Sequence, residues 1–402
     1  MMAVMGEPRR AGTAQAVGLL LAIQIPIVPI MALVPNLPLL LRHFVATPNR
    51  DLLIPLIITL PSLGIVLLGP LAGALADRWG RRRLLLGALG LFALAGVMPM
   101  ILDDLRWILA AQALVGVAEA VIITNANTLL GDYFPAEQRN RWLGIQSIIG
   151  PFSAALVTLG AGFLGTLSWH GPFAVNLVAG LMLLWLLPIT WEPNRDRPAA
   201  TDQEEKAGAG FPWARMLPIF AITVLTAMIF YAPTIYFGVM YDTLGAHSSA
   251  LISVLTTAGT VGSIFTGNYF RTQKHGAATH LALIYLFFGA GLLGFAYSSG
   301  YWMGLSFGVL VNCGIGLTLP ALVALALRTL PAVYRGRGMG LWMSSFFCAQ
   351  FLCPPAFAVL MRAMGGIRPA FALTGGFCLV LAAISVVCAR RAPAVPAALP
   401  SG

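Results

Sequence analysis

The chain has 402 residues, of which 58% are hydrophobic and only 9% are charged, and its mean hydropathy is +0.85. Soluble domains carry about 25% charged residues, so this composition excludes an ordinary soluble enzyme or binding domain and indicates a membrane protein. The net charge of +10 would suit a nucleic-acid partner, but the positions of the basic residues argue against that reading.

Twelve apolar segments follow one another along the chain, and each reaches the ~20 residues that a helix needs to cross a bilayer. The alternative, a closed β-barrel, would show alternating strands of about 10 residues. The sequence therefore predicts an all-α integral membrane protein with twelve transmembrane helices. The segments are residues 12–40, 51–76, 82–102, 106–131, 141–166, 171–191, 213–240, 248–270, 278–298, 301–327, 337–362 and 368–389.

A short pattern occurs twice. Residues 135–144 read PAEQRNRWLG and residues 331–340 read PAVYRGRGMG, and both fit P-A-x-x-R-x-R-x-x-G. Each follows the fourth span of its half, which indicates an internal duplication. Many transporters are built from repeated halves with the substrate site between them. We therefore expect two pseudo-symmetric six-helix bundles, at 1–191 and 213–402, joined by a polar cytoplasmic linker at 192–212.

Lysine and arginine residues are concentrated on one side of the predicted topology. With the N-terminus inside, the outer loops keep only Arg42, Arg50, Arg106, Arg362 and Arg368. This is the positive-inside pattern, so we expect both termini in the cytoplasm. The basic charge sets orientation in a lipid bilayer and does not predict a nucleic-acid partner. The compact loops fit a bacterial inner membrane by analogy.

One acid lies in the middle of an apolar span. Residues 113–130 read ALVGVAEAVIITNANTLL, and Glu119 is the only acid of the chain far from a helix end, a loop or a terminus. Gln112 and Asn127 lie on the same helical stripe. A low dielectric disfavours the charged form of a carboxyl group, so Glu119 is a candidate for proton coupling or for binding a cationic substrate. The alternative is a protonated side chain that donates one structural hydrogen bond.

Polar and aromatic side chains mark four spans as candidates for lining a cavity, because polar groups in lipid need partners or water. The candidate substrate residues are Gln24, Asn36, Tyr231, Tyr236, Trp342, Phe346 and Gln350. The same four spans also carry Pro26, Pro29, Thr223, Thr226, Met228, Phe230, Thr234, Thr256, Thr257, Thr260, Ser263, Ser344, Ser345 and Phe347. The aromatic residues could equally serve helix packing. No Cys/His cluster has metal-ligand spacing, so neither a metal nor a cofactor is expected.

Residues 73–83 read GALADRWGRRR at the inner end of the second span. Here the sequence resembles the major facilitator superfamily, whose signature between helices 2 and 3 is G-x-L-a-D-R-x-G-R-R/K. The resemblance implies alternating access by rocking of two halves, with a cytoplasmic latch that must open. The latch residues are Gly73, Asp77, Arg78, Gly80, Arg81 and Asp132, with Asp77 against the start of span 11 and Arg81 paired with Asp132. The alternative is that the arginines only anchor the topology.

The chain departs from the family pattern at two places. Family members with proton coupling often carry an arginine in span 4, where this chain has Gln112. Span 5 partly resembles the antiporter motif at Gly150 and Pro151, and a simple helix kink is the alternative reading, because proline removes a backbone hydrogen bond.

A transporter is the function that these features predict. We expect a monomeric, proton-coupled exporter of hydrophobic or cationic small molecules; the alternative is an importer, a proton symporter or uniporter, of a neutral or zwitterionic nutrient or chelate. No lysine or arginine lies deep in a span, which argues against strongly anionic substrates. An enzyme is not expected: GLSFG (304–308) fits a nucleophile elbow but lies inside span 10, without a strand–turn–helix context.

Overall fold

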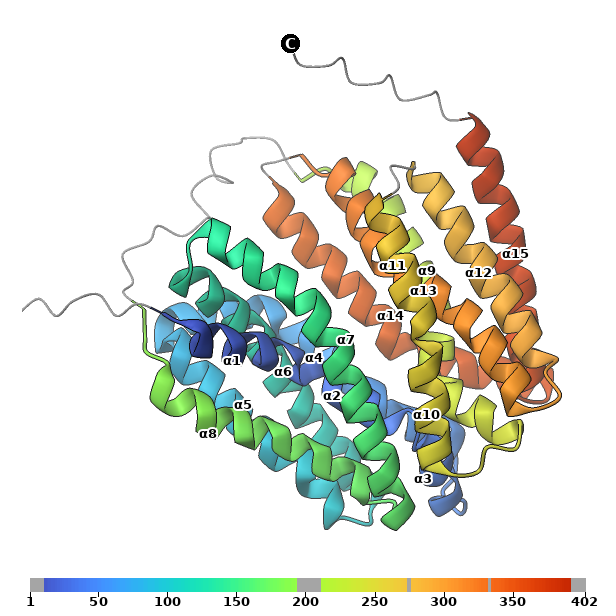
Figure 1. The fold of residues 1–402 in the computed structure, drawn as a ribbon, viewed down its shortest axis with the longest axis horizontal. Helices are drawn as coiled ribbons and strands as arrows, with labels where there is room; N and C mark the ends of the chain where they lie inside the picture. The colour runs from blue at the N-terminus through green and yellow to red at the C-terminus, as the bar shows by residue number, and fades with distance from the viewer. Residues whose placement is uncertain (1–10, 194–210, 273–275, 332–333, 392–402) are drawn as a thin grey trace, which may run out of the picture.

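The computed structural model describes residues 11–193, 211–272, 276–331 and 334–391. In these ranges all regular structure is helical, and twelve helices are long and apolar enough to cross a membrane (Figure 1). The predicted all-α fold of two six-helix bundles is confirmed. Most of the expected linker, 194–210, lies outside the described residues.

The helices of the first bundle pack around a core that includes Leu19, Leu89 and Phe92. They are α1 (Thr13–Gln24), η1 (Ile25–Ile27), α2 (Val28–Leu33), α3 (Leu37–His43), α4 (Arg50–Trp79), α5 (Arg81–Val97), η2 (Met98–Met100), α6 (Leu105–Tyr133), α7 (Ala136–Leu167), η3 (Gly171–Asn176) and α8 (Leu177–Ile189).

The helices of the second bundle pack around a larger aromatic core that includes Tyr236, Phe288 and Phe371. They are α9 (Trp213–Thr243), α10 (Ser249–Gly259), α11 (Val261–Thr272), α12 (Ala277–Ala296), α13 (Tyr301–Thr329), α14 (Arg335–Met364) and α15 (Ile367–Arg391).

Four spans that the sequence predicts as continuous are broken: 82–102 and 171–191 each carry a short 3-10 segment at one end, η2 and η3, while the first and eighth spans are broken in their interior. The first divides into α1, η1, α2 and α3, because Pro26, Pro29 and Pro38 each start a new helical segment and proline lacks the N–H that a helix interior needs. The eighth divides into α10 and α11 at Thr260. Both interior breaks lie beside the cavity described below, where irregular backbone is tolerated because it is not exposed to lipid.

The two halves meet at one end of the molecule, which we call the closed end and which carries α3 and the turn between α9 and α10. Here α4 packs on α14, α7 on α10, and α3 on α9. A Cβ added at Gly162 or Gly165 of α7 would collide with Ser253, Ser249 or Asn36. Only glycine allows backbones to come this close.

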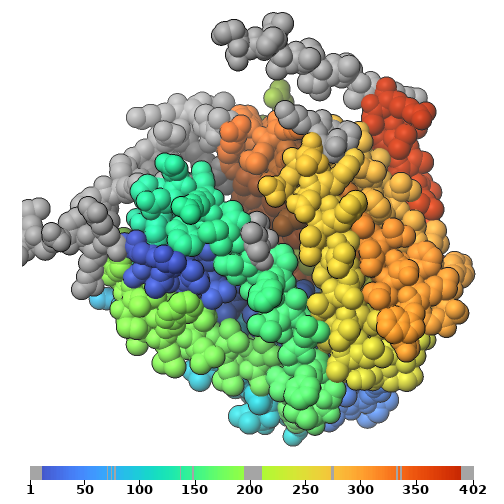
Figure 2. All heavy atoms as spheres, in the orientation of Figure 1, coloured from blue at the N-terminus to red at the C-terminus, as the bar shows by residue number. Residues whose placement is uncertain are grey.

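The opposite end, where α4 ends at Trp79 and α14 begins at Arg335, we call the open end. A Cβ added at Gly73, Gly267 or Gly340 would meet no atom of the described residues within 4 Å. The bundles diverge toward this end (Figure 1), and the surface is hollowed between α7 and α11 (Figure 2). The molecule is therefore closed at one end and parted at the other.

Candidate functional site

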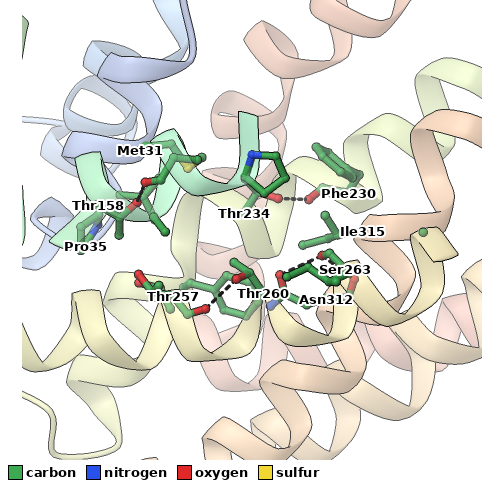
Figure 3. Close-up of a pocket in the computed structure, with 18 of the residues that line it drawn as sticks. Met31, Pro35, Thr158, Phe230, Thr234, Thr257, Thr260, Ser263, Asn312 and Ile315 are labelled. Atoms are coloured by element: carbon green, nitrogen blue, oxygen red, sulfur yellow. Dashed lines mark hydrogen bonds between the residues drawn. The ribbon is translucent and has the colours of Figure 1, made fainter. Parts of the chain in front are cut away.

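A cavity of about 670 Å³ lies between the two halves. Its walls come from α2, α7, α9, α10, α11 and α13, so both bundles contribute (Figure 3). This volume falls within the range of pockets that bind drug-sized molecules, about 300–1,000 Å³.

The wall from the first half is mostly apolar. It consists of Met31, Val34, Pro35, Pro151, Ala154 and Ala155, with Thr158 as the polar exception. Small side chains at 154 and 155 leave room, and Pro151 lies inside the continuous helix α7 with its side chain exposed to the cavity. This wall offers contact area and few hydrogen bonds.

The wall from the second half is rich in hydroxyl groups. It includes Thr234, Thr256, Thr257, Thr260, Ser263 and Asn312. At Thr260 the chain passes from α10 to α11, and Thr257, Thr260, Ser263 and Asn312 lie along one edge of the cavity, with Thr234 of α9 apart from them (Figure 3). Phe230 and Phe237 of α9 complete this side. Of the polar residues predicted in spans 7 and 8, Thr234, Thr256, Thr257, Thr260 and Ser263 line the cavity, whereas Thr223 and Thr226 are buried inside the bundle.

One charged side chain lies among the described residues that line the cavity. Arg271, in the last turn of α11, is the single charged side chain among the described lining residues, and no acid is among them. Its position near the end of α11 places it toward the open end. The cavity therefore has no group to neutralise a cationic ligand.

Apart from Phe230, the predicted aromatic substrate residues lie outside this lining, in the contact between α9 and α14. Trp342 is 0% exposed and its Nε1 donates to Thr223 Oγ1 at 3.0 Å. Its ring stacks on Phe346, which also packs on Tyr231 with ring centroids 5.3 Å apart. Tyr236 is buried against Phe357. These contacts hold the second bundle together.

Three predicted polar residues lie outside the cavity lining. Asn36 Nδ2 donates to Ala32 O at 2.7 Å and to Ala161 O at 3.2 Å, and so ties the first span to α7. The amide of Gln24 lies where a side chain at Gly150 would be. Gln350 is buried, and its Oε1 has no partner among the described residues.

The three residues of the predicted polar stripe on α6 differ in exposure: Gln112 and Glu119 are buried, and Asn127 is exposed. Glu119 is 3% exposed and Gln112 is fully buried, with neither amide atom of Gln112 partnered in the described part of the chain. Asn127 is exposed and its Nδ2 donates to Ile123 O at 2.8 Å. Gly116 on the same helix touches Pro61 of α4. Glu119 therefore sits within the first bundle and not on the cavity lining.

The latch residues at the open end show one of the two expected contacts. Arg81 forms an ion pair with Asp132, joining the start of α5 to the end of α6. The side chain of Asp77 lies outside the described part of the structure. Because both partners of the ion pair belong to one bundle and the open end is parted, separation of the halves does not require this pair to break.

A residue that the sequence did not indicate holds the start of α5. Glu192 accepts hydrogen bonds from the backbone N–H groups of Arg81 at 2.6 Å and Arg82 at 3.1 Å, as an acid at a helix N-terminus should. Gly80 precedes them with φ +94°, and a Cβ there would lie 2.8 Å from Glu192 Oε2. The positive φ, with the carboxylate of Glu192 close by, explains why glycine suits position 80.

The closed end carries polar contacts between the halves that sequence reasoning missed. Arg42 pairs with Asp242 at 3.0 Å, and Arg362 Nη2 donates to Asn49 Oδ1 at 3.1 Å. The only signal in the sequence was that Asp242 is the last acid of the chain. Loop charges of this kind are too common to indicate a contact.

Comparisons with known proteins agree with this architecture. The family model described as Major Facilitator Superfamily matches residues 19–277 and 270–402. The tetracycline resistance protein, class E, of Escherichia coli is 28% identical over 346 residues, which cover 82% of this chain and 84% of that protein. The bacillibactin exporter of Bacillus subtilis (strain 168) is 26% identical over 359 residues, covering 82% and 85%.

Solved structures show the same fold. A bacterial homologue of the human lysosomal transporter Spinster, in an inward-facing and unoccupied conformation, has a TM-score of 0.75 at 16% identity and covers 94% of this chain and 98% of that chain. The nucleoside transporter NupG has a TM-score of 0.73 at 12% identity and covers 94% and 100%.

The chain is a multi-pass membrane transport protein and not an enzyme. It belongs to the Major Facilitator Superfamily.

Proposed function

We propose that the chain is a proton-coupled exporter of hydrophobic small molecules, working by alternating access in a bacterial inner membrane. The observation that carries this proposal is the cavity of about 670 Å³ between the halves, which runs toward Arg271 near the open end while the closed end is packed shut. Access from one side at a time is what alternating access requires.

The basic residues support an open end that faces the cytoplasm. Arg82, Arg139, Arg271 and Arg335 lie at the ends of helices on this side, and cytoplasmic ends of membrane proteins carry the excess of Lys and Arg. In this orientation the molecule is in its inward-open state, in which an exporter takes up substrate. The 1–191 and 213–402 halves would rock about the closed end.

The chemistry of the walls favours neutral substrates over the cationic ones that the sequence also suggested. The first half offers an apolar wall, the second offers hydroxyls, and Arg271 would repel a cation. Two relatives support export, since one is named for tetracycline resistance and the other as a bacillibactin exporter. One chain supplies both walls, so we expect a monomer to suffice.

Glu119 is our candidate for the coupling proton. It is the one acid far from a helix end in the part of the chain that the structure describes, and it is 3% exposed. Ionisable residues at such depth are costly and mark proton relays in many transporters. Because Glu119 lies on α6, outside the cavity lining, we propose that it acts through the packing of α6 on α4.

The test uses the full chain in inside-out vesicles with an acidic lumen and a fluorescent pH probe. Neutral hydrophobic compounds and lipophilic cations are added separately, and proton release is followed together with uptake of compound into the lumen. Release that depends on a neutral compound, together with its uptake, is the expected result. Uptake only in right-side-out vesicles would move the assignment to import, and uptake without proton movement would remove the coupling.

A further inference from the structure

The hydroxyl groups of the cavity share one hydrogen-bonding arrangement. Thr234 Oγ1 donates to Phe230 O at 2.7 Å, Thr256 Oγ1 to Ile252 O at 2.8 Å, and Thr260 Oγ1 to Thr257 O at 2.6 Å. Each of these side chains gives its proton to a backbone carbonyl of its own helix.

Two more hydroxyls follow the same rule. Thr158 Oγ1 donates to Ala154 O at 2.8 Å, and Ser263 Oγ donates to Asn312 O at 2.8 Å on the neighbouring helix α13. Thr257 is the exception, since its Oγ1 has no partner among the described residues. The dashed bonds of Figure 3 show this pattern for Thr234, Thr260 and Ser263.

The consequence for a ligand follows from the valence of a hydroxyl group. It has one proton to donate and two lone pairs that accept. Where the proton is held by a carbonyl, the oxygen faces the cavity as an acceptor only. A ligand O–H or N–H gains a hydrogen bond there without breaking one, whereas a ligand carbonyl or ether oxygen must compete for a proton already in use.

Side chains that can donate hydrogen bonds to a ligand lie on the same wall, at its end nearest the open end of the molecule. Asn268 and Arg271 lie in the last turns of α11, beyond Ser263. The wall therefore changes from acceptors in the interior to donors near the open end. The facing wall, with Met31, Val34 and Pro151, is apolar.

We propose that this cavity selects neutral amphiphiles that carry several hydroxyl groups along one edge and an apolar face opposite. This inference rests on the proposed export function and names its substrate class. The hydroxyl groups of the ligand donate to the threonine and serine oxygens of the second-half wall, and its apolar face packs on the wall from α2 and α7. Because the ligand carries no positive charge, Arg271 does not repel it. A polar site of this type rejects analogues that lack the donors, because its groups then stay unpaired.

The experiment measures binding of three compounds with one ring skeleton to the purified full-length protein, by quenching of tryptophan fluorescence. The probes are a tetrahydroxyflavone, its tetramethyl ether and unsubstituted flavone. The ether lacks donors and is larger, while flavone lacks donors and is smaller, so size is separated from hydrogen bonding. We expect the hydroxylated compound to bind roughly tenfold more tightly than either, as two or more net hydrogen bonds would give.

Variants locate the preference in the wall. Thr256→Val and Thr260→Val together remove two acceptor oxygens at nearly constant volume and should reduce the preference severalfold, while Thr256→Ser with Thr260→Ser should retain it. Thr374→Val is the matched control, since its Oγ1 donates to Ala370 O at 2.8 Å on α15, away from the cavity. Circular dichroism and thermal unfolding check that each variant is folded.

The outcomes separate this inference from the function on which it rests. Equal or tighter binding of the ether or of flavone would overturn the inference, even if vesicles export all three compounds. A valine variant that weakens all three compounds equally would also overturn it, because the threonines would then act only on the shape of the cavity. Tight, donor-dependent binding without export would support the inference and contradict the proposed function.

Discussion

Arg42, in the last turn of α3, and Asp242, in the last turn of α9, form an ion pair with an Nη1–Oδ1 distance of 3.0 Å. The pair joins the two halves at the closed end. His247 Nδ1 lies 3.1 Å from the same Oδ1, and Arg42 Nη2 donates to the His247 carbonyl. The two paired side chains are 49% and 24% exposed, so solvent limits the pair to about 1 kcal/mol or less.

Asp242→Asn should shift the molecule toward opening at the closed end. If the substitution removes up to about 1 kcal/mol of the free energy that stabilises the closed form of this end, the ratio of open to closed molecules rises at most about fivefold. The measurement is the labelling rate, by a membrane-impermeant maleimide added on the closed-end side, of a cysteine introduced as Ser253→Cys. Ser253 is fully buried between the halves, against Gly162. The background is the labelling of the chain without this cysteine.

The matched control is Asp51→Asn, because Asp51 pairs at 3.6 Å with Arg50 of its own helix and not across the halves. Equal labelling rates in the two variants would show that the Arg42–Asp242 pair does not hold this end closed. The exchanged pair, Arg42→Asp with Asp242→Arg, should return the rate toward that of the unmodified protein.

Glu119→Gln should abolish proton release driven by a transported compound and leave binding of that compound within about threefold. Glutamine keeps the shape of the side chain but cannot exchange a proton, and the cavity lining does not include Glu119. Proton release is measured with the pH probe in vesicles. Glu137→Gln, an exposed acid in the first turn of α7, is the control. Unchanged release in Glu119→Gln would assign the residue a structural role.

Gly116→Ala should destabilise the first bundle by about 1–3 kcal/mol, as overpacking does. The new Cβ would lie 2.5 Å from Pro61 O and 2.7 Å from Pro61 Cα, and backbone atoms of α4 cannot move aside as a side chain could. Thermal unfolding in detergent measures the loss. Gly87→Ala on α5 is the control, because its Cβ would meet no described atom within 4 Å. Similar unfolding temperatures for both variants would contradict the close crossing of α4 and α6.

Trp342→Phe should cost more stability than the about 0.5–1.5 kcal/mol of one net hydrogen bond, because the smaller ring also leaves a cavity at a site that is 0% exposed. The lost bond is the one from Nε1 to Thr223 Oγ1 at 3.0 Å. A double-mutant cycle with Thr223→Val isolates this contact, since the two losses should not add. Additive losses would argue against the bond. Binding of the tetrahydroxyflavone should be unchanged. A large loss of affinity for it with unchanged stability would instead make Trp342 a substrate residue.

Asp132→Asn should lower thermal stability by about 1.5 kcal/mol, as loss of a hydrogen bond to a charged group does, without changing labelling at the closed end. Arg81 and Asp132 join α5 to α6 within the first half. Their separation should therefore loosen that half and leave the contact between the halves unaltered. A labelling rate that changes as much as in Asp242→Asn would show that the pair controls the position of the halves.

The membrane class, the twelve spans and the family motif could be predicted from the sequence because each is a local property. A run of ~20 apolar residues spans a bilayer whatever its neighbours are, and the GALADRWGRRR stretch is contiguous. The isolation of Glu119 followed in the same way, by counting acids along the chain. The Arg81–Asp132 pair followed from the family pattern.

The cavity and the closed end depended on tertiary structure. Which face of a helix meets the other half is set by tilt and rotation against neighbouring helices, and span length does not determine either. Arg42 and Asp242 lie 200 residues apart, and Arg81 meets Glu192 across 111 residues. The polar and aromatic residues of span 7 show the limit: Thr234 lines the cavity, while Tyr231 and Tyr236 pack inside the bundle. All three are hydroxyl-bearing residues within six positions of one span. The rotation of α9 about its axis decides which of them faces the cavity.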